Sequence, residues 1–133
     1  IKPDLAIAVD VGVAYDVPGM TGEKNEGKLG DGPLAILMDA TSIAHDGLRK
    51  HIKDVAEHHN IPVQWATTPG GGTDAGSIHV ANEGIPTITI GVPLRYMHSN
   101  VSVLNIDDYT NSVRLITEIA RSLNDDSYQA LMW

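Results

Sequence analysis

The chain has 133 residues, of which 42% are apolar and only 5% aromatic, so a single domain with an aliphatic core is expected. It carries 17 acidic and 9 basic side chains, and the net charge of −8 disfavours nonspecific binding to nucleic acid or anionic membranes because both are polyanions. Cysteine is absent, which excludes disulfides and thiolate metal sites and fits a reducing compartment, so we expect a cytoplasmic protein.

The chain begins at Ile1 rather than at a methionine and enters an apolar run at Leu5. We therefore expect a piece of a longer protein, truncated at its N-terminus. The run over 5–11 has the length of a strand and is interrupted only by Asp10. Glycine and proline punctuate a long loop over 12–33, and loops of this length are usually functional or disordered.

A second strand and the first helix follow this loop. The apolar run over 34–38 predicts a buried strand that ends at Asp39. Over 48–59, apolar side chains recur at helical spacing, and Asp46 is the expected N-cap. Apolar and polar side chains then alternate over 61–67, which predicts a further strand.

The second half of the chain continues the alternation of strands and helices. A glycine-rich turn over 69–74 leads into a short helix that is expected to end at Gly84. The β-branched residues over 85–90 predict a strand that continues through Val92. These elements complete the pattern of strands separated by helices.

The last helix opens with Asp107 and Asp108, two acids that suit the positive end of the helix dipole. Helical spacing predicts an apolar face made of Tyr109, Val113, Ile116, Ala120 and Leu123. We expect the polar tail after Asn124 to fray, while 131–133 could dock elsewhere on the molecule.

The order of elements predicts an α/β fold, a mostly parallel sheet with helices on both faces. In open sheets of this kind, ligands bind beyond the carboxyl ends of the strands. Asp10, Asp39 and the turn over 70–74 follow or end predicted strands, so we expect all three at that edge.

Two familiar catalytic patterns are absent. The glycine-rich segment over 70–76 lacks the lysine of a phosphate-binding loop, and Asp74 would repel a phosphate. Ser99 is adjacent to His98 and no Gly-x-Ser-x-Gly motif is present, which excludes a serine hydrolase site of that kind. The default interpretation of 70–76 is a flexible turn with Thr73 or Asp74 as the N-cap.

Asp10 and His98 are candidates for metal chemistry, each with a structural alternative. A carboxylate in an apolar strand needs compensation, and either a cap of loop amides or a metal would provide it. His98 follows a buried strand in an irregular segment where its tautomer could be fixed for metal binding. The other five histidines lack local acid partners, and we assign them structural or solvated roles.

Seven segments, taken in order, resemble the M42 family of metallo-aminopeptidases. They are Ala8-Val9-Asp10-Val11, Asp16-Val17-Pro18-Gly19, Leu29-Gly30-Asp31-Gly32-Pro33, Ile61-Pro62-Val63-Gln64, Gly72-Thr73-Asp74-Ala75, Gly84-Ile85-Pro86-Thr87 and Pro93-Leu94-Arg95-Tyr96-Met97-His98-Ser99. The resemblance covers nearly the whole chain. It implies a three-layer, zinc-peptidase-like sandwich.

The resemblance also implies a two-metal hydrolase that releases N-terminal residues from peptides. Family members hold two divalent ions, usually zinc or cobalt, which activate water and polarise the scissile carbonyl. Asp10 matches a ligand of one ion and His98 a ligand of the other. Asp16, Thr73, Asp74 and Arg95 match positions near the substrate cleft. Members also form homo-oligomers.

The chain departs from the family pattern at its N-terminal end. The early His, the bridging Asp, the ligand Glu and the general-base Glu of the family all lie upstream of the Asp10 position, so no catalytic base is expected in this chain. We therefore interpret 1–133 as the C-terminal portion of a catalytic domain. This piece is expected to be inactive, to bind no metal by itself and to expose an apolar patch that 131–133 could cover.

Two alternatives remain open. The chain could be a non-catalytic folded module or remnant. It could also belong to a cellulase, as some relatives are described, because Asp10, Asp16, Asp39 and Asp74 could include a pair of glycosidase carboxylates. The cellulase interpretation leaves His98 without a role.

Overall fold

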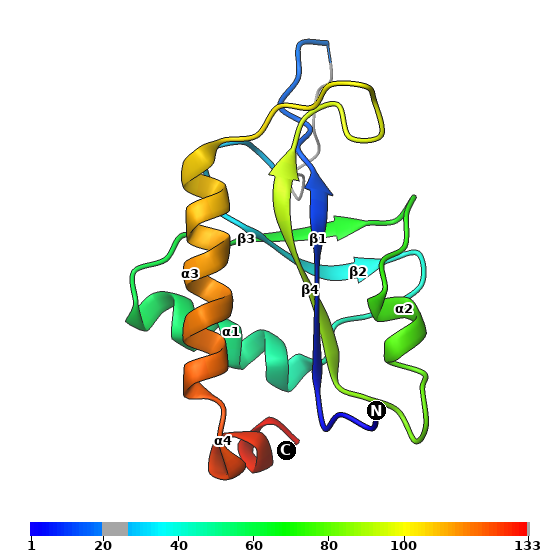
Figure 1. Ribbon diagram of the computed structural model, residues 1–133, viewed down its shortest axis with the longest axis vertical. Helices are drawn as coiled ribbons and strands as arrows, with labels where there is room; N and C mark the ends of the chain where they lie inside the picture. The colour runs from blue at the N-terminus through cyan, green and yellow to red at the C-terminus, as the bar shows by residue number, and fades with distance from the viewer. Residues whose placement is uncertain (20–26, 133) are drawn as a thin grey trace.

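The computed structural model describes residues 1–19 and 27–132. The described residues form four strands and four helices (Figure 1). These are β1 (Ala6–Val13), β2 (Leu34–Asp39), α1 (Asp46–His58), β3 (Gln64–Thr68), α2 (Ala75–Ile78), β4 (Thr87–Leu94), α3 (Ile106–Ser122) and α4 (Asp125–Leu131). Within the described ranges, no helix combines the length and the hydropathy that a membrane span requires.

The sheet has the order β1-β4-β2-β3. β1 pairs with β4 in parallel, and so does β2 with β3, whereas β2 and β4 are antiparallel. The mostly parallel sheet is thus confirmed, with one antiparallel junction in its middle. β2 begins beside the C-terminal half of β4, where Leu34 faces Gly91, and runs back along it.

The antiparallel junction corrects one prediction. Asp39 ends β2, and the turn over 70–74 follows β3. Both strands run against β4, so their carboxyl ends point away from the carboxyl ends of β1 and β4. Asp39 and the turn therefore do not share the sheet edge to which Asp10 belongs.

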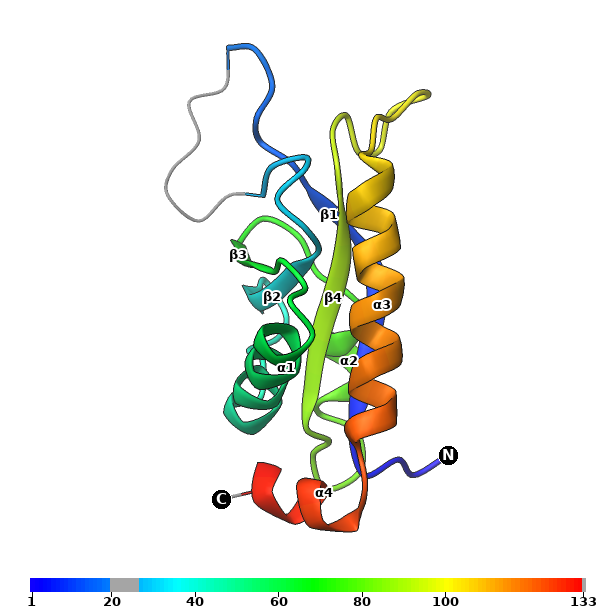
Figure 2. The same cartoon turned by 90° about the vertical axis from the view of Figure 1, so that its left-hand side faces the viewer.

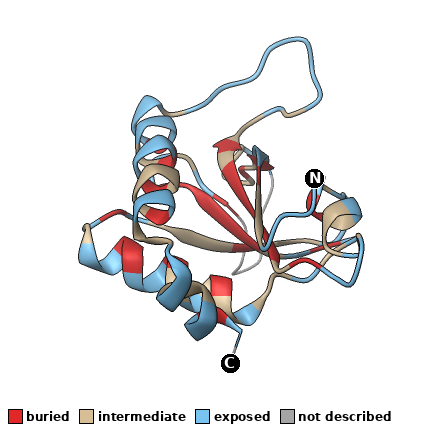
Figure 3. Cartoon of the chain, turned by 60° about the horizontal axis from the view of Figure 1, so that its bottom comes forward, coloured by how far each residue is buried: buried red, intermediate tan, exposed pale blue. Residues whose placement is uncertain are grey.

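Helices cover both faces of the sheet, as predicted (Figures 2 and 3). α1 and α3 pack on one face, where Ile88 and Ile90 of β4 are at most 1% exposed. The side chains that meet them include Leu48 and Ile52 of α1 and Leu115 and Ile119 of α3. Each buried aliphatic side chain of this size stabilises the fold by about 1.5–3 kcal/mol. α2 contacts β1 and β4, and Leu34, Ile36 and Ala66 form a second small core cluster.

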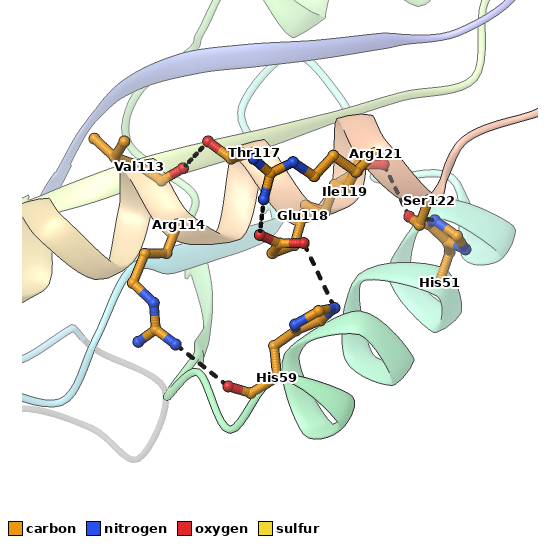
Figure 4. A network of polar contacts seen from close by, with 9 residues as sticks. All are labelled: His51, His59, Val113, Arg114, Thr117, Glu118, Ile119, Arg121 and Ser122. Atoms are coloured by element: carbon orange, nitrogen blue, oxygen red, sulfur yellow. Dashed lines mark hydrogen bonds and ion pairs between the residues drawn. The ribbon is translucent and has the colours of Figure 1, made fainter.

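Polar contacts join α1 to α3 along their shared side (Figure 4). His51 Nε2 lies 2.8 Å from Ser122 Oγ, and His59 Nε2 lies 3.7 Å from Glu118 Oε2. Arg114 donates a hydrogen bond to the His59 carbonyl at 3.4 Å. These contacts give His51 and His59 structural roles, whereas the sequence left a structural or a solvated role open.

The buried face of α3 differs from the predicted one. Tyr109 and Val113 are about half exposed, at 50% and 49%, whereas Asp108 and Ser112 are buried beside Leu115. The helix turns Asp108 rather than Tyr109 toward the interior, where the Asp108 carboxylate accepts hydrogen bonds from the Gly30 and Gly32 N–H groups. Part of the apolar stripe that starts at Tyr109 is consequently left on the surface.

The tail after Asn124 does not fray but forms α4. The Asn124 side chain accepts from the Ser127 backbone N–H, and the Ser127 hydroxyl accepts from the Asn124 N–H, which completes a capping box. Leu131 is buried in the core, and a Cβ on Gly47 would lie 2.0 Å from its carbonyl oxygen. The docking predicted for 131–133 is therefore seen at Leu131, while Trp133 lies outside the described residues.

Candidate functional site

Asp10 lies on β1 opposite Gly91 of β4, on the face that also carries Thr89. Its side chain is exposed, and its Oδ1 accepts a hydrogen bond from the Val11 N–H at 2.7 Å. The sequence argument that Asp10 is a buried acid in need of compensation is wrong for this chain. β1 is an edge strand of the described sheet, so water reaches the carboxylate directly.

His98 lies in a loop that follows β4 and is closed by two backbone hydrogen bonds between Arg95 and Val103, at 2.9 and 3.1 Å. The Tyr96 carbonyl accepts from the hydroxyls of Ser99 and Ser102, at 2.6 and 3.2 Å. Tyr96 and His98 themselves have positive φ angles of 60° and 64°. Such backbone costs about 1–3 kcal/mol per residue and is concentrated at functional sites. The exposed His98 shares this conformation with Tyr96 in the same loop and with Asn60 and Asn82 elsewhere in the described residues.

Parallel pairing brings Asp10 and His98 to the same end of the sheet. Asp10 is three residues before the end of β1 at Val13, and His98 is four residues after the end of β4 at Leu94. Both strands point toward the loop that carries His98 (Figure 1). That their side chains approach each other stays a prediction.

Arg95 and Asp16 form an ion pair beyond the same strand ends. Arg95 Nε donates to Asp16 Oδ1 at 3.0 Å, and Nη2 donates to Oδ2, so the contact has the two-point geometry that a guanidinium offers a carboxylate. The hydrogen bond from Arg95 is the largest influence on Asp16 and holds the pKa of that carboxyl below its ordinary value. The Leu29 N–H donates to the same carboxylate at 3.3 Å and acts in the same direction.

Thr73 contacts other residues than Arg95 and Asp16. Its hydroxyl donates to Asp39 Oδ2 and lies 2.8 Å from both that atom and Thr89 Oγ1. Asp39 also accepts from Thr41 and from the Ser42 N–H. Burial alone would raise the pKa of Asp39, but these hydrogen bonds outweigh it and lower the pKa to about 2.

Of the four residues expected at the cleft, the described contacts therefore join Asp16 to Arg95 and place Thr73 in a separate cluster around Asp39. Asp74 is exposed at the start of α2 and makes no side-chain cap there. Thr89 connects the two regions, because it lies on the face of Asp10 and bonds to Thr73.

Sequence analysis named Asp108 only as an acid of the first helical turn and Gln64 only as part of a family segment, and it missed the contacts that both make. Asp108 accepts hydrogen bonds from the N–H groups of Gly30 and Gly32, and Gln64 bonds to Lys28 and Gly32. Both residues thus hold the segment over 28–32, and that segment contacts Asp16. The two glycines in this segment were the only sequence signal, since they allow its unusual backbone.

Carboxylate and imidazole are suitable ligands for zinc or cobalt, so Asp10 and His98 fit a metal centre in kind. They do not fit it in number. The described residues contain no cluster of three His, Asp or Glu side chains that could hold a metal, and zinc sites have three or four protein ligands. Beyond the ends of β1 and β4, the described residues present the Arg95 guanidinium, the Asp16 carboxylate and His98 with its positive φ angle.

A sequence model of one peptidase family, M42 glutamyl aminopeptidase, matches residues 1–115. The chain belongs to the M42 family. It is 38% identical over 125 residues to the glutamyl aminopeptidase of Lactococcus lactis, covering 94% of this chain and 34% of that protein. The M42 chain thus spans about a third of the relative's length.

Solved structures agree with this assignment. The TET aminopeptidase of a marine sediment archaeon (Thaumarchaeota) superposes with a TM-score of 0.91 at 35% identity, over 97% of the M42 chain and 36% of that structure. The TET1 peptidase of Pyrococcus horikoshii, which assembles into a tetrahedron or a large octahedral shell, gives 0.71 at 30% identity, over 88% and 33%. A structure described as an endoglucanase, from Thermotoga maritima, gives 0.68 at 26% identity, over 95% and 35%.

Proposed function

We propose that residues 1–133 are the C-terminal portion of the catalytic domain of an M42 aminopeptidase, a hydrolase that removes N-terminal residues from peptides. The observation that carries the proposal is the family match over 1–115 combined with the shared sheet end of Asp10 and His98. In the longer enzyme, Asp10 would be a ligand of one metal ion and His98 a ligand of the other. The remaining ligands and the general base would come from outside this chain.

Arg95 is the described residue best suited to contact substrate. A guanidinium can hold a carboxylate or a carbonyl oxygen by two hydrogen bonds, and the contact with Asp16 keeps it oriented. Asp16 has the supporting role. Thr73 would stabilise the turn after β3 through Asp39, and the exposed Asp74 in that turn stays a candidate for the substrate cleft although it lies at the opposite strand ends.

The endoglucanase alternative is weaker because of how the four candidate carboxylates are engaged. Asp16 is bound by Arg95, and Asp39 accepts hydrogen bonds from three residues. Of these four carboxylates only Asp10 and Asp74 stay exposed. Asp10 lies within β1 and Asp74 follows β3, two strands that run in opposite directions. The non-catalytic module remains the second candidate, since fewer than three metal-binding side chains cluster in the described part.

We further propose the cytoplasm as the location, zinc or cobalt as the metal and a homo-oligomer as the working form. The absence of cysteine supports the first, and the donor chemistry of Asp10 and His98 supports the second. The assembly of the related TET1 peptidase supports the third.

The test uses the longer protein that contains this chain, loaded with zinc or cobalt and assayed on aminoacyl-anilides and on a soluble glucan. We expect anilide hydrolysis that is lost in Asp10→Asn and in His98→Ala and retained in His58→Ala, a matched change on the exposed surface of α1. Glucan hydrolysis without anilide hydrolysis would refute the proposal. Full activity of both site variants would remove Asp10 and His98 from the metal centre.

A further inference from the structure

The segment over 28–32 connects the first turn of α3 to the Arg95–Asp16 pair. At one end, Asp108 is 1% exposed and accepts from the Gly30 N–H at 2.7 Å and from the Gly32 N–H at 2.8 Å, using a different carboxylate oxygen for each. Hydrogen bonds to an ionised acceptor are about twice as strong as those between neutral groups. This end of the segment is therefore held firmly.

The backbone of the segment is shaped for this contact. Gly30 and Gly32 have φ angles of 91° and 94°, which residues with a side chain rarely adopt. A Cβ at Gly32 would also lie 2.4 Å from the Pro62 carbonyl oxygen. Glycine at these positions lets two nearby N–H groups turn toward one anion, as in the anion-binding concavities formed by short loops, and here the anion is the Asp108 side chain.

The same segment reaches Asp16 from its other side. Leu29, next to Gly30, donates its N–H to Asp16 Oδ2 at 3.3 Å. Gln64 holds the segment by three further hydrogen bonds. Its Oε1 accepts from the Lys28 N–H at 2.9 Å, and its Nε2 donates to the Lys28 and Gly32 carbonyls at 2.8 and 2.7 Å. Any shift of the segment therefore moves the Leu29 N–H relative to Asp16.

We infer that Asp108 is a positioning residue for the Arg95–Asp16 pair and acts through the backbone of the segment over 28–32. The inference deepens the proposed function, since it rests on Arg95 being a residue of the substrate cleft. Asp108 also contributes to stability, because an apolar side chain in its place would leave the Gly30 and Gly32 N–H groups without an acceptor. An acceptor with two oxygens is what orients both glycine N–H groups.

The test replaces Asp108 by Asn in the 133-residue chain, with Asp107→Asn as the matched control. Asp107 precedes Asp108 in the same helical turn and is exposed, so its change removes the same charge from the same helix end. By NMR, we expect hydrogen exchange of the Leu29 N–H and of the Arg95 Nε–H to become about tenfold faster in Asp108→Asn and to stay unchanged in the control.

The titration of Asp16 adds a readout with a diagnostic sign. Removing a nearby negative charge would by itself lower the pKa of Asp16. A loosened contact with Arg95 would instead raise it toward its ordinary value, so a rise in Asp108→Asn identifies loss of positioning. Unchanged exchange of the Arg95 Nε–H together with an unchanged or lower pKa of Asp16 would overturn the inference.

A second measurement on the unsubstituted chain serves if Asp108→Asn does not fold. The inference requires the Gly30 and Gly32 N–H groups to be protected at least as strongly as the Arg95 Nε–H, because the pair depends on the segment. Rapid exchange of both glycine N–H groups beside a protected Arg95 would overturn it.

Kinetics of the longer enzyme separate the inference from the proposed function. We expect Asp108→Asn to raise KM severalfold with little change in kcat, as Arg95→Ala should if Arg95 binds substrate. If the NMR changes occur and both variants keep the original KM and kcat, Asp108 positions the pair but the proposed substrate role of Arg95 fails.

Discussion

The Thr73 hydroxyl donates to the Asp39 carboxylate and lies 2.8 Å from it, which ties the turn after β3 to the end of β2. Asp39 is 6% exposed and accepts further hydrogen bonds from the Thr41 and Ser42 N–H groups, each at 2.7 Å. A buried carboxylate with this many donors belongs to the framework of the molecule, so its loss should be visible in stability.

We predict that Asp39→Asn destabilises the chain at neutral pH and makes its free energy of unfolding less dependent on pH in the acid range. The pKa of Asp39 is about 2 in the folded state against the ordinary 3.8, so its contribution is complete above 3.8 and is lost as pH falls through about 2. The shift corresponds to roughly 2–3 kcal/mol. Urea unfolding at neutral pH and at about pH 2.5 measures both effects. Asp74→Asn, an exposed neighbour, should leave the curves in place.

We predict that Arg95→Gln raises the pKa of Asp16 toward its ordinary 3.8, because the hydrogen bond from Arg95 is the main cause of the lowered value. With the pair intact, Asp16 contributes stability above pH 3.8 that is lost as the pH falls below that value. The variant should therefore lose less stability on acidification than the original chain. Carboxyl ¹³C NMR follows the titration. Arg49→Gln, which breaks the exposed contact with Asp46, serves as the control and should leave Asp16 unaffected.

We predict that His51→Gln makes stability less dependent on pH near 6. Burial lowers the pKa of His51 below the ordinary 6.5, and the opposing charge of Asp54 is the smaller influence. The unfolded chain therefore binds more protons in this range, and the folded chain loses stability as pH falls through 6.5. Thermal unfolding between about pH 5 and 7.5 tests this. The same slope of stability against pH in His51→Gln and in the original chain would contradict the prediction. The control is His58→Gln, a change at an exposed histidine of the same helix.

We predict that the 133-residue chain does not bind two zinc ions tightly. Asp10 and His98 would supply one ligand to each ion, and zinc sites need three or four. Calorimetric titration should give no stoichiometric binding. Binding of two ions that disappears in His98→Ala would show that the described residues form a complete centre after all.

We predict that the chain self-associates through apolar side chains on its surface. Val9 of β1 is 61% exposed and Val113 of α3 is 49% exposed, and β1 has a free edge in the described sheet. Sedimentation at several concentrations should show a rising mass. Val113→Lys should weaken the association, whereas Thr110→Lys, which adds the same charge to the same helix, should not. A monomer at all concentrations would favour the self-sufficient module.

The sequence by itself predicted the elements whose pattern is local. Leu48, Ile52, Val55 and Ala56 are buried as helical spacing predicted, because a 3.6-residue period directs these side chains to one side. The alternation of strands and helices likewise indicated a mostly parallel sheet covered on both faces. The ordered motifs from Asp10 to His98 indicated the M42 family, since the order of such segments is a property of the chain.

Tertiary structure decided the relationships between distant segments. The antiparallel entry of β2 moved Asp39 away from the edge of Asp10, and no local pattern encodes strand direction. Asp108 is buried because Gly30 and Gly32, more than 70 positions earlier in the chain, present their N–H groups to it. Helical spacing cannot anticipate such a contact, because it assigns burial by hydrophobicity, whereas here hydrogen bonds satisfy the buried charge.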